Sequence, residues 1–149
     1  MAEKLNALRL DTETGAITLP CGGTGRFTMD LTAPEGIALT PGTDVAVLGI
    51  GQKDEDNPQA YVAVSRMECA IRQRTDGSLY VLVEFANADT RTIAPGTYAW
   101  DLTIVTDPER DANGMVIVDD TSDNVYPVYA ASDTGKLPKF TLRGAVPVV

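Results

Sequence analysis

The sequence has no histidine among its 149 residues. Histidine is the side chain that gains or loses charge near neutral pH, and it is the commonest general base and transition-metal ligand. Without it, neither a serine–histidine nor a cysteine–histidine nucleophile pair can form. We therefore predict that the protein is not an enzyme and has no catalytic residues.

Cysteine is also scarce, with only Cys21 and Cys69 in the chain. Two cysteines allow at most one disulfide, so a fold held together by several bridges is excluded. Residues 1–6 have neither the basic nor the apolar region of a secretion signal, so we expect no signal peptide. Because such a protein stays in a reducing compartment, we expect both thiols to be free, although the sequence leaves their pairing open.

Basic residues and long apolar runs are few. The 12 Lys and Arg residues stand against 21 Asp and Glu residues, which gives a net charge of −9. Nucleic acid is disfavoured as a partner, because binding to it needs a basic stripe that contacts phosphates. No window holds the roughly 20 apolar residues of a membrane helix, so we predict no membrane insertion.

What the chain does contain is short alternating segments, in a composition that is 44% hydrophobic. No segment keeps the i, i+3, i+4, i+7 apolar spacing of an amphipathic helix. Short strands between closely spaced turn residues are typical of a β-sandwich. We therefore predict one all-β domain over residues 1–149, an immunoglobulin-like antiparallel β-sandwich with little or no helix. The expected strands are 5–10, 16–19, 26–31, 44–50, 61–64, 67–72, 79–85, 98–104, 115–118, 126–129 and 140–143.

The most informative stretch is residues 95–104. A Pro-Gly turn is followed by strict alternation, which places four large side chains on one face: Tyr98, Trp100, Leu102 and Ile104. This phase predicts that Trp100, the single tryptophan, belongs to the core. Residues 89–94 show no strand period and predict a turn or one helical turn. A tyrosine at such a strand start is typical of a tyrosine corner, in which its hydroxyl bonds to backbone a few residues upstream.

The order of these parts resembles a known family. The parts are a strand with a glycine-rich turn (17–25), an alternating strand (27–31), a valine-rich strand (41–50), the Asp-Thr, Pro-Gly-x-Tyr and Trp-Asp-Leu set (89–102) and a closing strand (140–142). This pattern resembles the immunoglobulin-like N-terminal domain of phage baseplate upper proteins and related prophage tail structural proteins. The resemblance implies a non-enzymatic virion structural subunit that assembles by symmetric contacts, located in the virion or in the host cytoplasm during assembly.

Two loops could suggest a cofactor. The glycine-rich run at residues 21–25 lacks the Lys-Ser/Thr of a phosphate-binding loop, so we expect a tight connection between strands. Four oxygen-bearing residues alternate through a later loop and could face a calcium ion: Asp107, Glu109, Asp111 and Asn113. Gly114 comes too late for the EF-hand spacing, and no bidentate glutamate follows at the expected place. We predict no cofactor and no metal site, and the sequence leaves cation binding by residues 107–113 open.

A carbohydrate-binding or adhesin module is the alternative function. Trp100 could stack on a sugar, but its phase with Leu102 and Ile104 favours the core. The better candidates for exposed aromatics are tyrosines, and these suit protein interfaces as well as sugars: Tyr61, Tyr80, Tyr126 and Tyr129.

The last residues, 144–149, are apolar, and we expect them to form an extended tail. Such a segment could pair with the sheet edge of a neighbouring chain, which is a known mode of peptide recognition. We therefore expect the partners to be further copies of this chain, as a homo-oligomer, or other virion tail or baseplate proteins. The number of copies and the glycan question stay open.

Overall fold

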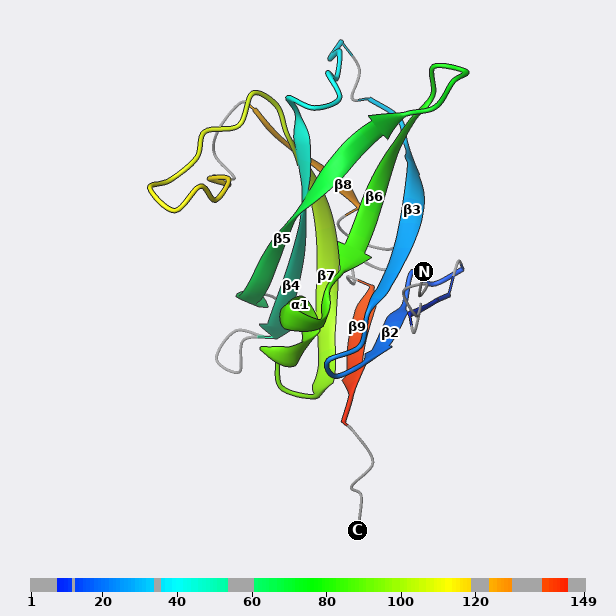
Figure 1. Ribbon diagram of the computed structural model, residues 1–149, viewed down its shortest axis with the longest axis vertical. Coiled ribbons are helices and arrows are strands. Elements are labelled where there is room, and N and C mark those ends of the chain that lie inside the picture. Colours follow the sequence, from blue (N-terminus) through cyan, green and yellow to red (C-terminus); the bar gives the residue numbers. More distant parts are fainter. Residues whose placement is uncertain are drawn as a thin grey trace, which may run out of the picture.

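The chain forms strands that curve around one interior (Figure 1). The computed structural model describes residues 8–11, 13–33, 36–53, 61–118, 124–129 and 138–144. Its elements there are β1 (Arg9–Leu10), β2 (Ile17–Pro20), β3 (Gly25–Leu31), β4 (Val45–Lys53), β5 (Tyr61–Gln73), β6 (Leu79–Phe85), α1 (Asn87–Arg91), β7 (Gly96–Val105), β8 (Val125–Tyr129) and β9 (Lys139–Arg143). The prediction of an all-β fold with little helix is confirmed. Within these ranges no helix is long and apolar enough to cross a membrane.

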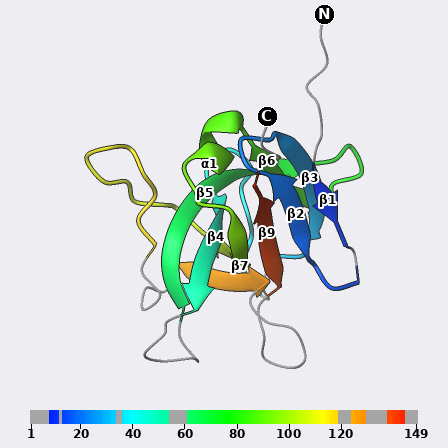
Figure 2. The same ribbon diagram turned by 90° about the horizontal axis from the view of Figure 1, so that it is seen from below.

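The strands belong to one sheet with the order β1-β2-β9-β7-β4-β5-β6-β3. Strand β8 lies outside this order and pairs with residues 102–105 of β7, on the edge where β9 pairs with residues 96–99. The β2–β9 pair is parallel, and the other pairs are antiparallel. Figure 2 shows the sheet wrapped almost into a barrel, with β1 and β3 as its two ends. The immunoglobulin-like two-sheet arrangement stays a prediction.

The core follows the alternation of the strands. The inward side chains of β7 are almost completely buried, with Trp100 at 1%, Leu102 at 1% and Ile104 at 0% exposure. Those of β3 and β6 face the same interior, as predicted. A second, smaller cluster on the outer face of β4 and β7 contains Val45, Val47 and Val105. The middle of the sheet is therefore buried on both faces.

The segment 115–118, predicted as a strand, is not one. Only one isolated bridge forms there, between Arg110 and Val116, and the Ile117 amide donates to the Glu109 carbonyl at 2.8 Å. Val116 and Val118 instead pack on the outer valine cluster. The apolar run thus covers a sheet face and does not extend the ladder.

Two other predicted strands, 61–64 and 67–72, are one continuous strand, β5. The turn at 75–77 that joins β5 to β6 is confirmed, and Gly77 supplies its positive φ of 92°. Of the predicted strand 5–10, only residues 8–10 belong to the described part. The loop residues 54–60 and 119–123 and the tail residues 145–149 also lie outside the described residues.

The glycine-rich turn between β2 and β3 contacts α1. The buried Thr90 hydroxyl donates to the Gly23 carbonyl at 2.8 Å, and the Asn87 amide donates to the Gly22 carbonyl at 2.5 Å. A Cβ at position 23 would lie 2.6 Å from the Pro20 ring, so the turn requires glycine there. The prediction of a tight connection is confirmed, and the turn positions the short helix.

The expected tyrosine corner is present. The Tyr98 hydroxyl donates to the carbonyl oxygen of Ala94 at 2.6 Å. The helical turn expected at residues 89–94 forms slightly earlier, as α1, which leads the chain from β6 to β7. This hydrogen bond fixes the entry into β7 and with it the position of Trp100, two residues further along.

Candidate functional site

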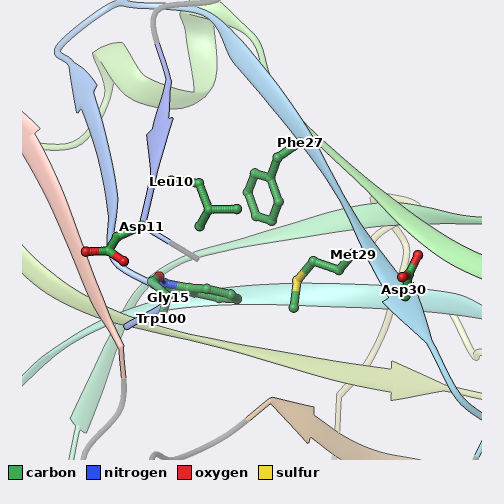
Figure 3. Close-up of a pocket in the computed structure, with 7 residues that line it drawn as sticks. All are labelled: Leu10, Asp11, Gly15, Phe27, Met29, Asp30 and Trp100. Atoms are coloured by element: carbon green, nitrogen blue, oxygen red, sulfur yellow. Dashed lines mark hydrogen bonds between the residues drawn. The ribbon is translucent and has the colours of Figure 1, made fainter. Parts of the chain in front are cut away.

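A pocket of about 510 Å³ lies between β3 and the hairpin of β1 and β2. Figure 3 shows Leu10, Phe27, Met29 and Trp100 around the gap between the two ends of the sheet, with the carboxylates of Asp11 and Asp30 directed away from it. We call it the seam pocket. Its lining residues are Leu10, Asp11, Gly15, Phe27, Met29, Asp30 and Trp100. Leu10, Phe27 and Met29 are only partly buried, so this apolar lining is open to solvent.

Trp100 forms the inner wall of the seam pocket. Its indole Nε1–H donates to the Gly15 carbonyl at 2.8 Å. Its ring meets Phe27 edge to face, with 6.2 Å between centroids and 66° between planes. The prediction that Trp100 belongs to the core is confirmed. A ring so covered cannot act as an exposed platform for a sugar.

The two carboxylates of the pocket serve the surrounding backbone and a neighbouring cation. Asp11 Oδ1 accepts from the amides of Glu13 at 2.9 Å and Thr14 at 3.3 Å. Asp30 Oδ1 pairs with the Arg74 guanidinium at 2.7 Å. Each of these bonds uses Oδ1. The pocket therefore combines an apolar lining with carboxylates at its rim, which suits binding of an apolar group better than proton transfer.

The loop 106–118 uses its oxygens to hold itself in place. Asp111 Oδ1 accepts from the amides of Asn113 at 2.8 Å and Met115 at 3.0 Å. The amide of Asp107, whose φ is 45°, donates to Asp44 at the start of β4. In the part of the chain that the structure describes, no three His, Cys, Asp or Glu residues gather as a metal-binding group. Asp111 thus acts as a turn-forming side chain.

The candidate tyrosines differ in their surroundings. The Arg74 guanidinium lies over the Tyr80 ring, 4.6 Å from its centroid. Tyr126 packs against the main core. The side chains of Tyr61 and Tyr129 lie outside the described part. No sugar platform therefore emerges from the two tyrosines whose side chains are described.

Both cysteines are free thiols. Cys69 is buried in the core, and burial raises its pKa to about 12. The Cys21 Sγ lies 3.6 Å from the Thr90 carbonyl oxygen and is partly buried beside α1. A thiol with the pKa of Cys69 stays protonated at neutral pH and is a poor nucleophile.

Sequence reasoning did not find the seam pocket. Its apolar members were recognised as core residues, because alternation places Phe27, Met29 and Trp100 inward. The signal that they line an opening is the position of β1 and β3 at the two ends of the sheet. That position depends on strand order, which alternation does not encode.

Comparison of the chain with protein families, curated proteins and solved structures found no match. The function is therefore argued from the chain's own residues.

Proposed function

We propose that the protein is a non-enzymatic structural subunit that acts by assembly with other protein chains, of the phage or prophage tail or baseplate type that its sequence resembles. The observation that carries this proposal is the incomplete closure of the sheet. Among the described strands, no ladder joins β1 to β3, and an apolar pocket lies between them. Edge strands offer backbone groups for pairing, and apolar lining gains free energy when a partner covers it.

The other long free edge supports the choice of this surface. Strand β5 pairs with β4 from Tyr61 to Ala70 but with β6 only from Ala70 onward. Its free part contains a register shift opposite Ile50/Gly51 and carries the exposed charges of Arg66 and Glu68. Bulges and charges are the devices by which proteins prevent edge pairing. This edge also exposes Val62 and Val64, but beside these charges, whereas the seam places its partly exposed apolar side chains around a pocket.

The sequence resemblance indicates the location and the partners of the proposed structural subunit. The phage or prophage setting rests on the resemblance of the sequence, whereas the Tyr98 hydrogen bond and the buried Trp100 follow from the local strand pattern. We propose an immunoglobulin-like sandwich whose place is the virion, or the host cytoplasm during assembly, and whose partners are copies of itself or other tail and baseplate proteins.

Sedimentation velocity of the full chain tests this proposal, from low micromolar to high concentration, with a glycan array in parallel. We expect a mass that rises above the monomer with concentration and no glycan bound. A strict monomer that binds a glycan would contradict the proposal and favour the carbohydrate-binding alternative.

A further inference from the structure

We propose that the seam pocket binds a large apolar side chain from an extended, basic segment of a partner protein. The inference rests on the proposed assembly function, because it names the surface and the chemistry of the partner. Three features of the pocket define this partner: the space next to its aromatic rings, the charge at its rim and the direction of the strands that flank it.

The first feature is space next to aromatic rings. The volume of about 510 Å³ is large enough for an aromatic or branched aliphatic side chain. The exposed parts of Phe27 and Met29 would contact it, with Trp100 behind them. Aromatic and aliphatic anchors in a pocket contribute most of the binding energy at protein interfaces.

The second feature is negative charge around the opening. Asp11 lines the pocket and Glu13 follows on the β1–β2 turn, both exposed, and the whole chain carries −9. Asp30 also lines the pocket, but its charge is paired with Arg74 on the outward face of β3. The bonds of Asp11 engage Oδ1, so a cation can approach its Oδ2 without breaking them. Opposite charge across an interface favours a partner with lysine or arginine beside its anchor.

The third feature is the direction of the flanking strands. Both β1 and β3 are ends of the sheet, so a segment that lies between them is most easily accommodated in extended form. An extended segment places alternate side chains on one face. An apolar anchor with basic residues two positions to either side would therefore direct all three toward the pocket and its rim.

Trp100 supplies the readout, since it is the only tryptophan and forms the inner wall of the pocket. The probe is the capped peptide Lys-Thr-Phe-Thr-Lys, titrated into the full chain while tryptophan emission is recorded. We expect a saturable change in emission. Replacing the peptide's phenylalanine by alanine, or its lysines by glutamates, should abolish the change.

Two pairs of protein variants locate the binding. Met29→Lys should abolish it, whereas Thr28→Lys, on the exposed face of the same strand, should not. Asp11→Asn keeps the Oδ1 acceptor but removes the charge, and should weaken binding about two- to fivefold, as for an exposed ion pair. Asp111→Asn makes the same change in a similar turn elsewhere and should have no effect. Thermal melts establish that each variant is folded.

Three outcomes would overturn the inference. One is no emission change with the basic peptide. Another is equal binding of the glutamate peptide. The last is that 2-phenylethylamine binds as tightly as the basic peptide or more tightly, which would make the pocket a small-molecule site. Self-association is also compared in two variants, a chain lacking residues 145–149 and Met29→Lys. If only the shortened chain loses self-association, the tail and not the seam pocket mediates self-assembly. Self-association without peptide binding would refute this inference and leave the proposed function standing.

Discussion

Replacing Trp100 tests the central claim about the core. The side chain is 1% exposed and its indole N–H bonds to the buried Gly15 carbonyl. Trp100→Ala removes a large buried aromatic, so we expect it to lower the free energy of unfolding by about 3–5 kcal/mol. Trp100→Phe keeps a ring but leaves the Gly15 carbonyl without its donor, which should cost about 1–3 kcal/mol.

The assay is urea unfolding followed by circular dichroism, because the variants lack the fluorescent reporter. Tyr80→Phe is the matched control, since its ring lies on the surface under Arg74 and the change leaves that contact in place. A loss of less than about 1 kcal/mol for Trp100→Ala would show that the ring is exposed, against the range for a buried aromatic. That result would refute the argument from alternation and revive the sugar-platform hypothesis.

Four further predictions follow from single side chains. Tyr98→Phe removes the hydrogen bond to the Ala94 carbonyl and should lower the free energy of unfolding by about 1 kcal/mol in the same urea assay. Asp44→Ala leaves two backbone amides without their buried acceptor and should cost about 2–4 kcal/mol, whereas Asp44→Asn, which keeps one acceptor oxygen, should cost less. Burial raises the pKa of Cys69 from 9.0 to about 12, so above about pH 9 the unfolded thiol loses its proton while the folded one keeps it. The contribution of the Cys69 thiol to the free energy of unfolding is therefore fully present below pH 9. Above pH 9 the free energy of unfolding should fall by up to about 1.4 kcal/mol per pH unit in urea melts of the native chain, and Cys69→Ala should not show this fall. Native-state labelling should modify Cys21 before Cys69, and equal rates would contradict the burial of Cys69.

The sequence by itself determined which residues are buried wherever one local rule applied. A period of two along 26–31, 79–85 and 98–104 predicted the inward faces of β3, β6 and β7, because successive side chains of a strand alternate between its faces. Local turn chemistry placed the turn at 75–77 and the Tyr98 hydrogen bond, since each involves residues close together in the chain.

Only the tertiary structure decided which strands are neighbours. Alternation records the buried face of a strand but not the strand on either edge, so it could not show that β1 and β3 end the sheet or that a pocket lies between them. The same limit explains the wrong strand at 115–118, whose apolar residues cover the outer valine cluster. The bond from Trp100 to Gly15 joins residues 85 positions apart, and no local pattern encodes a contact made by folding across that distance.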